Sequence, residues 1–349
     1  MSPPAATNLQ SQVADNVQIV KDKLGQVDVN DPNKPVFSDQ KYPPLEDYDY
    51  KDRALNADPS KAALLSAVTK RIELTPYIGT ELHGIQLSQL TDKQKDELAL
   101  LIAERGVVYF RDQDINPEQQ LELGRYFGRL HIHPTSGQPQ QEGLEEIHVV
   151  FSDGKTVREY GTRGHQTYWH SDVTYERQPP SYTSLIVDEV PSTGGDTLWI
   201  SGYAAYDKLS PPYKKFLEGL HATHSAVEQA ENSRKRGGPV RREPVISTHP
   251  VIRTHPVTGK KSLFVNPIFT RKIVELSEDE SDSVLKYLYS HIAGGYDFMV
   301  RFKWEKNSVA FWDNRITAHT AIWNYDGERR HGHRVTPQGE RPFYHSEEQ

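Results

Sequence analysis

Apolar side chains recur at every second position in the segment 298–304. Phe298, Val300, Phe302 and Trp304 alternate with more polar residues after Met299. Successive side chains of a β-strand point to opposite faces, so this spacing predicts a half-buried strand. Short runs that also favour strands occur at 107–110, 184–187, 196–200 and 308–312.

Helix-start signals stand between these strands. Thr91 with Gln94 forms a capping-box pattern for a helix that Gly106 ends. Further helices are predicted to begin at Asn116, Ser210 and Ser277. The segments that hold the candidate site residues described below lie on strands, and helices flank them. This arrangement predicts a mixed α/β fold with a β-sandwich core. The specific prediction is a double-stranded β-helix (jelly roll) flanked by helices, rather than a doubly wound parallel sheet.

Residues 1–70 are polar and rich in Pro, Asp and Lys. Such a segment buries too little apolar surface to order on its own, so it is expected to be an extension that wraps the core or docks on a neighbouring subunit. The folded domain is predicted to span 71–349. The sequence leaves open whether the chain forms a homo-oligomer.

Composition excludes several classes of site. The chain has no cysteine, so disulfides and thiolate-based metal or nucleophilic sites are absent. A net charge of −7 argues against a nucleic-acid surface. No apolar run is long enough for a membrane helix, and the N-terminus lacks the pattern of a signal peptide. A soluble, cytoplasmic protein with a small-molecule partner is expected.

Three residues form a candidate metal site: His170, Asp172 and His319. Residues i and i+2 of a strand share a face, so the first two could chelate one ion together. Two imidazoles and one carboxylate are the ligand set that holds non-heme Fe(II) with open coordination positions. A His-x-Asp pair alone is weak evidence, because a surface histidine beside a helix-capping aspartate explains it equally well.

Two arginines follow this set. Arg330 and Arg334 lie 11 and 15 residues after His319, and positions four apart on a strand share a face. Arginine grips carboxylates and sulfonates through a planar fork of donors. Because two buried arginines without anions would be costly, the pair predicts bound anionic ligands.

With these residues in place, the chain resembles the taurine dioxygenase family of Fe(II)- and 2-oxoglutarate-dependent oxygenases over about 71–345. The matching segments are 169–174, 191–199, 249–256, 263–266 and 312–315. Among members of that family, the chain is most similar to fungal sulfonate dioxygenases, through the segments 234–238 and 341–344.

The resemblance implies Fe(II), 2-oxoglutarate and O₂ as cofactor and co-substrates. It implies iron ligation by His170, Asp172 and His319, and a grip on 2-oxoglutarate by Thr197 and Arg330. The residues implied in substrate binding are His133, Gln166, the backbone N–H of Val173, Phe269 and Arg334. Two positions depart from the family pattern, where Ser136 replaces a tyrosine and Gln166 an asparagine.

The implied reaction is hydroxylation of the carbon next to a sulfonate, which releases sulfite and an aldehyde together with succinate and CO₂. Because of the two departures, an organic sulfonate is favoured without taurine being singled out. An alkyl sulfate ester or another small anion, such as an aryloxy acid, is the alternative on the same scaffold. A zinc hydrolase would not need two anion-gripping arginines, and a non-catalytic binding protein would not need the intact ligand set.

Other conspicuous residues are given structural interpretations. The basic cluster Arg234-Lys235-Arg236 with Arg241-Arg242 is interpreted as a solvated loop, since it lacks the aromatic platform of a nucleic-acid site. Five histidines outside the candidate site are expected to be structural: His221, His224, His249, His255 and His291.

Overall fold

The computed structural model describes residues 31–154, 168–325 and 327–346. The chain divides into two compact units, Met1–Lys34 and Pro35–Gln349. In the first unit, the described residues 31–34 form a turn in which the N–H of Lys34 donates to the carbonyl of Asp31 at 3.2 Å. All helices and strands named below belong to the second unit, which therefore includes residues 35–70 of the predicted extension.

The largest sheet has seven strands in the order β1-β2-β3-β13-β5-β15-β4. Only β2 and β3 pair in parallel, and the remaining neighbours are antiparallel. In that order the strands are Lys70–Glu73, Thr80–His83, Val107–Phe110, Ser308–Asp313, Tyr182–Glu189, Arg330–Val335 and His148–Ser152.

Three smaller sheets complete the strands of the described residues. One has the order β12-β6-β14, with Met299–Phe302, Thr197–Ser201 and Thr317–Ala321. The second has the order β11-β7-β8, with Thr270–Ile273, His221–Ser225 and Ile246–Pro250. The third pairs β10 with β9, as Lys261–Leu263 and Ile252–Thr254.

An aromatic core lies between the seven-stranded sheet and the β12-β6-β14 sheet. Tyr109 of β3 stacks on Phe302 of β12 with ring centroids 4.0 Å apart, and Trp199 of β6 packs against Tyr109 edge-on. Val300, Phe302 and Trp304 all bury in this cluster, as the alternation predicted. Phe298 does not, because it ends the short 3-10 helix η4 (Tyr296–Phe298) and packs in a different cluster. The predicted strand is thus shorter than 298–304.

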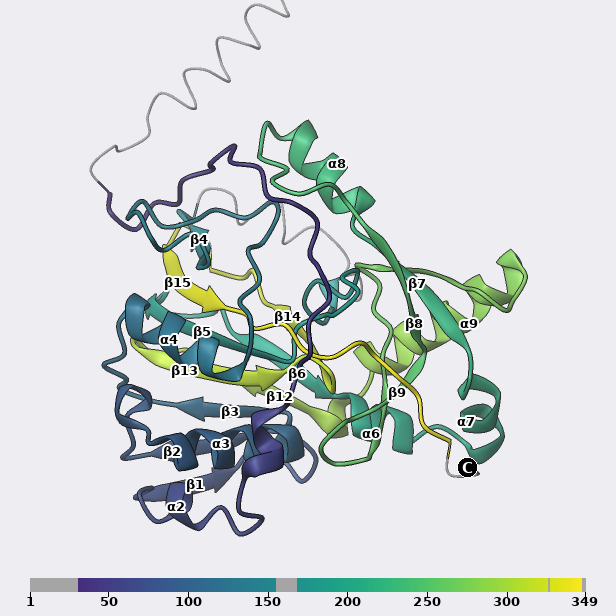
Figure 1. The fold of residues 1–349 in the computed structure, drawn as a ribbon, viewed down its shortest axis with the longest axis horizontal. Helices are drawn as coiled ribbons and strands as arrows, with labels where there is room; N and C mark the ends of the chain where they lie inside the picture. The colour runs from purple at the N-terminus through teal and green to yellow at the C-terminus, as the bar shows by residue number, and fades with distance from the viewer. Residues whose placement is uncertain (1–30, 155–167, 326, 347–349) are drawn as a thin grey trace, which may run out of the picture. The chain divides into compact units, whose positions relative to one another are not determined.

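Helices α3 (Asp92–Arg105) and α4 (Pro117–Phe127) cover the other face of the seven-stranded sheet (Figure 1). The first begins with the predicted capping box at Thr91, and the second begins at the predicted N-cap Asn116, which also forms a capping box with Gln119. Val107 and Tyr109 of β3 face the aromatic core, whereas Val108 and Phe110 pack against the helices. Strand β3 is therefore buried on both faces, which explains why the whole run 107–110 is apolar.

The remaining helices are short, apart from α9. They are η1 (Arg53–Asn56), α2 (Ala62–Leu65), η2 (Leu87–Gln89), α6 (Gly202–Asp207), α7 (Pro211–Leu217), α8 (Val227–Lys235) and α9 (Glu278–Ala293). The helices predicted to begin at Ser210 and Ser277 correspond to α7 and α9. Among the described residues, none of the helices combines the length and apolar character needed to span a bilayer.

Residues 35–70 are tied to the unit by buried polar groups. Asp52 is 4% exposed, accepts a hydrogen bond from the hydroxyl of Tyr182 at 2.9 Å, and pairs with the buried guanidinium of Arg315. The N–H of Leu64 donates to the carboxylate of the fully buried Glu97 at 2.6 Å. A buried charge without its partner is strongly destabilising, so these contacts fix the polar segment on the core.

Candidate active site

His170 and His319 face each other across a two-residue β-bridge. The N–H of each donates to the carbonyl of the other, at 3.0 and 2.7 Å. Residues that exchange both hydrogen bonds place their side chains on the same face, and the two rings lie 4.2 Å apart between centroids. The expectation that His170 and Asp172 lie together on a strand was wrong: only His170 makes a bridge, and Asp172 begins a turn.

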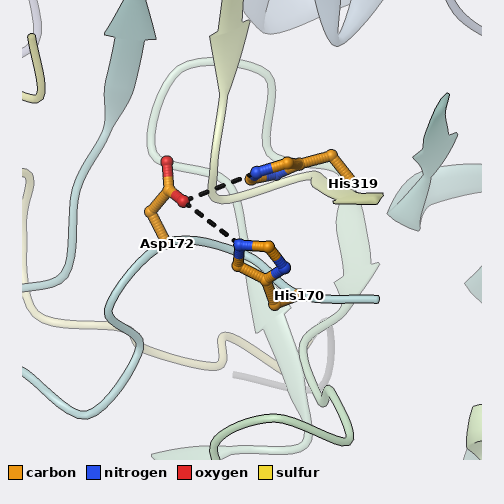
Figure 2. Close-up of side chains that lie close together, drawn as sticks. All are labelled: His170, Asp172 and His319. Atoms are coloured by element: carbon orange, nitrogen blue, oxygen red, sulfur yellow. Dashed lines mark ion pairs between the residues drawn. The ribbon is translucent and has the colours of Figure 1, made fainter. Parts of the chain in front are cut away.

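Asp172 completes this group. Its Oδ1 lies 3.7 Å from Nε2 of His170 and 3.6 Å from Nε2 of His319, and Figure 2 shows the carboxylate facing both imidazoles. Its Oδ2 accepts from the hydroxyl of Thr183 at 3.1 Å. The side chain of Asn314 accepts from the N–H of Asp172 and donates to Thr183, at 3.1 and 2.8 Å. The orientation of the carboxylate is therefore fixed by neighbours.

Both imidazoles are neutral, which is the form that binds a cation. Nδ1 of His170 donates to the carbonyl of Tyr168 at 2.8 Å, which leaves the Nε2 lone pair directed toward Asp172. Burial lowers the pKa of His170 to about 4 and that of His319 well below its ordinary value, so both rings are neutral at pH 7. The three ligand atoms lie within 4.8 Å of one another. Two neutral imidazoles and a carboxylate are a fitting donor set for Fe(II).

The turn after Asp172 is strained. Val173 is 3% exposed and has a φ of 37°, a region that β-branched residues rarely enter. The carbonyl of Val173 accepts from the N–H of Glu176 at 3.0 Å, while its own N–H has no acceptor among the described residues. Phe269 lies beside this turn, with its ring centroid 6.2 Å from that of His170. Such strain is typical of functional sites.

Arg330 and Arg334 share one face of β15, as the sequence predicted. Arg334 stands opposite Leu185 of β5, which belongs to the aromatic core, and the two guanidiniums lie 5.6 Å from the ring centroids of Trp304 and Trp312 respectively. Arg334 also contacts Oδ1 of Asp172. Burial lowers the pKa of Arg334 to about 9, which leaves it positively charged at neutral pH.

Arg330 differs from Arg334 in having no carboxylate partner. Its side chain is buried, it forms no ion pair with any residue that the structure describes, and its Nε lacks an acceptor there. Trp304 links it to Thr197, because the indole N–H of Trp304 donates to the hydroxyl of Thr197 at 3.0 Å while Arg330 packs over the indole ring. Arg330 and Thr197 therefore both contact Trp304 and lie at one edge of the aromatic core.

His133 lies in the loop after α4 with a defined tautomer. Its Nδ1 accepts from the backbone N–H groups of Thr135 and Ser136, each at 3.2 Å. The proton of the neutral ring is therefore on Nε2, which is free to donate to a ligand. Burial is the main cause that lowers the pKa of His133 well below its ordinary value. Gln166, the remaining predicted substrate contact, lies outside the described residues.

The interpretation of Arg241 and Arg242 as part of a solvated loop was wrong. Arg241 is 1% exposed and donates from Nη1 to the carbonyl of Ser136 at 2.6 Å, while Arg242 pairs with the buried Glu176 at 3.4 Å. Arg234, Lys235 and Arg236 are exposed, as expected. A guanidinium can satisfy several backbone carbonyls at once, which allows a charged residue to support the loop that carries His133.

Three further supporting residues were missed by the sequence reasoning: Thr183, Trp304 and Asn314. Asn314 lay in a segment already noted for its resemblance to the family, so that segment was the available signal. Thr183 and Trp304 lie in or beside predicted strands, where nothing in the local pattern distinguishes a hydrogen-bonding role from ordinary packing.

A second group of ligand-type side chains lies on the opposite face of β15. His331 and His333 converge on Asp188, which sits at an irregularity in the pairing of β5 with β15. Nδ1 of His331 is 2.6 Å from one carboxylate oxygen of Asp188, and Nδ1 of His333 is 3.8 Å from the other. The short imidazole–carboxylate hydrogen bond accounts for this arrangement.

Comparisons with known proteins agree with this geometry. The family model described as "Taurine catabolism dioxygenase TauD, TfdA family" matches residues 70–336. An "Alpha-ketoglutarate-dependent sulfonate dioxygenase" of Saccharomyces cerevisiae is 46% identical over 314 residues, which cover 87% of this chain and 76% of that protein. A "Putative alpha-ketoglutarate-dependent sulfonate dioxygenase" of Schizosaccharomyces pombe is 47% identical over 311 residues, with 89% and 80% covered.

A solved structure supports the same relationship. The crystal structure of a putative alpha-ketoglutarate-dependent taurine dioxygenase from Burkholderia xenovorans matches with a TM-score of 0.68 and 34% identity, covering 79% of this chain and 94% of that one. The sheet-rich core with flanking helices is thus shared with this enzyme. By sequence and by fold, the chain belongs to the TauD/TfdA family of dioxygenases.

Proposed function

We propose that the chain is an Fe(II)- and 2-oxoglutarate-dependent dioxygenase that hydroxylates the carbon next to the sulfonate of a small organic sulfonate. The observation that carries the proposal is the contact of a two-histidine, one-aspartate group with Arg334, which shares one face of β15 with the buried Arg330. The names of the two yeast relatives support the substrate class.

His170, Asp172 and His319 would hold the iron. Their neutral imidazoles and oriented carboxylate need no rearrangement of protonation to bind a divalent cation. Thr183 and Asn314 would keep the carboxylate in place, since hydrogen-bonded neighbours orient metal ligands. The bound iron, with O₂ and 2-oxoglutarate, supplies the oxidising power of the reaction.

Arg330 and Thr197 would bind the carboxylate of 2-oxoglutarate that is distant from the metal. The buried guanidinium of Arg330 lacks an anionic partner among the described residues, and the Thr197 hydroxyl, which already accepts from Trp304, still has a proton to donate. A carboxylate at this point would satisfy both groups and offset the cost of burying the charge.

Arg334, His133 and the N–H of Val173 would bind the sulfonate. Arg334 supplies the positive charge, His133 donates from Nε2, and the Val173 N–H needs an acceptor. Fixing the anion directs the adjacent C–H toward the metal, and Phe269 would cover the carbon chain. One oxygen atom of O₂ enters succinate and the other the substrate hydroxyl. The hydroxylated carbon then becomes an aldehyde as its C–S bond breaks and sulfite leaves.

The test is anaerobic loading with Fe(II) and 2-oxoglutarate, followed by O₂ and a panel of taurine, isethionate and butanesulfonate. Succinate and sulfite are expected in equal amounts with at least one sulfonate. Alkyl sulfate esters belong in the same panel, because their hydroxylation would release sulfate instead of sulfite. Succinate formation that no sulfonate stimulates, with sulfate formed from esters, would overturn the sulfonate assignment.

We also propose that the facing sheets form the double-stranded β-helix predicted from the sequence. Their arrangement supports this, because the seven-stranded sheet and the β12-β6-β14 sheet enclose one aromatic core and the candidate ligands stand at its edge. A crystal structure of the iron-loaded protein would test this topology directly.

A further inference from the structure

His148 is placed on the same side of the sheet as Arg334. It is the first residue of β4 and stands directly opposite Arg334 in the ladder between β4 and β15. Directly opposed residues of an antiparallel pair project to the same face. Since Arg334 packs over Trp312, His148 also points to the candidate active site. The ring of His133 lies 4.8 Å from that of His148, between centroids.

The ring of His148 has no hydrogen-bond partner among the described residues. His131 and His170, the neighbouring imidazoles, both do: His131 is 2.9 Å from Glu176 and His170 is bonded to Tyr168. Polar groups in such partly buried positions are normally paired with protein, water or a ligand. The surroundings offer positive charge, since Arg334 and Arg241 both lie near the ring. An anion is the complementary partner for a donor in this environment.

His148 can offer one N–H donor to an anion without adding a positive charge. Burial and the nearby Arg334 lower the pKa of His148 well below its ordinary value, so the ring is neutral at pH 7. A neutral imidazole always carries one N–H and one lone pair. The nitrogen that carries the proton can follow the ligand, because neither nitrogen is fixed by a described neighbour.

We propose that His148 is a further specificity-determining residue, which donates a hydrogen bond to the oxyanion end of the substrate. The inference rests on the proposed function and extends it. With His133, Arg334 and the Val173 N–H, four donors surround one end of the substrate from a loop, two strands and a turn. A sulfonate presents three oxygens as a tripod, whereas a carboxylate presents two in one plane. Four donors therefore favour a tetrahedral oxyanion over a carboxylate.

The competing interpretation is that His148 only packs against the ring of His133. Two variants separate these roles. His148→Phe keeps an aromatic ring and removes the donor, whereas His148→Gln removes the ring and keeps an N–H donor. His333→Gln is the matched control, because His333 lies on the same strand pair but on the opposite face of the sheet, opposite Ile186.

The experiment measures KM and kcat with butanesulfonate, KM with 2-oxoglutarate, and the turnover ratio between butanesulfonate and pentanoate. His148→Phe should raise KM for butanesulfonate about tenfold or more, the scale of a lost hydrogen bond to a charged group. It should leave KM for 2-oxoglutarate within about twofold and lower the preference for sulfonate over carboxylate. His148→Gln should recover part of both effects, and His333→Gln should match the wild type.

Binding is measured in parallel by calorimetric titration of butanesulfonate into the anaerobic Fe(II)–2-oxoglutarate complex. Equal affinity of wild type and His148→Phe, or a loss in His148→Gln as large as in His148→Phe, would overturn the donor role. If the wild type releases no sulfite from any sulfonate, the proposed function fails, and the calorimetric comparison still decides whether His148 contacts the anion. If His148→Phe does not fold, His148→Leu replaces it as the donor-free variant.

Discussion

His170 and His319 exchange both of their backbone hydrogen bonds, so two residues from distant parts of the chain are set side by side by their main chains. The bridge itself is made of backbone groups only. Side-chain substitutions at either position are therefore expected to remove a ligand while the bridge itself persists.

His319→Ala is expected to lose stoichiometric Fe(II) binding and all 2-oxoglutarate turnover, while the fold remains. The reason is that only two ligands of the group would be left. Metal content after anaerobic loading and gel filtration measures this, with circular dichroism as the check of folding. His333→Ala serves as the control, because it alters the second histidine group on the far face of β15. Retained activity in His319→Ala would reject the ligand assignment.

Arg334→Ala is expected to lower kcat/KM for the sulfonate by about 100-fold or more, the scale of removing one partner of a buried charge pair. Binding of 2-oxoglutarate should change little, since Arg330 and Thr197 lie in a separate corner beside Trp304. Sulfite release and 2-oxoglutarate affinity are the two measurements. Sulfite release at the wild-type rate would contradict the anion-binding role of Arg334.

Asp52→Ala is expected to lower the free energy of unfolding by about 2–3 kcal/mol, because Arg315 and Tyr182 would each lose a buried hydrogen-bond partner while Arg315 keeps Asp313 and Glu340. Asp47→Ala is the matched control in the same polar segment. Its ion pairs with Arg177 and Arg341 are largely exposed and should together contribute about 1 kcal/mol or less. Urea unfolding of both variants measures the difference. Equal losses would show that the segment 35–70 is not held by its buried charge.

Stability should fall as the pH is lowered from about 6.5 to 4. Burial lowers the pKa of His249 to about 4 in the folded protein, whereas the unfolded chain titrates near 6.5. Above 6.5 both states are neutral. Below it the unfolded state takes up a proton first, so acid favours unfolding, by about 3 kcal/mol for this histidine at pH 4.

His249→Gln should therefore be less stable at pH 7 but show a shallower loss of stability between pH 6.5 and 4. The comparison is a series of urea unfolding curves across that interval. His221→Gln, which alters a half-exposed histidine, is measured beside it as the comparison variant. An unchanged slope in His249→Gln would mean that another buried group dominates the acid response.

Local rules predicted much of the secondary structure. The capping box at Thr91, the N-cap at Asn116 and the alternation through Val300 and Phe302 depend on residues close in sequence. The structure confirms the helices and the strand that they predicted. The face shared by Arg330 and Arg334 was predicted for the same reason, since a strand fixes it by its period of two.

Other features depend on contacts between distant segments. Asp172 reaches His170 because the chain turns at a strained Val173, and not because both residues lie on one strand. No local sequence pattern predicts a positive φ at a valine. The burial of Arg241 depends on carbonyl groups more than one hundred residues earlier in the chain. Neither arrangement could be predicted from composition or periodicity, because each is decided by the partners that the fold supplies.

Strand β15 presents arginines on one face and histidines on the other. A shift of one residue in its pairing would turn His331 and His333 inward and send both guanidiniums toward α4. The misaligned strand would then place imidazoles at the sites where the carboxylate and the sulfonate bind. The register in which this one strand pairs during folding thus decides whether the protein can bind two anions. A one-residue deletion between Arg330 and Arg334 should abolish turnover even if the chain still folds.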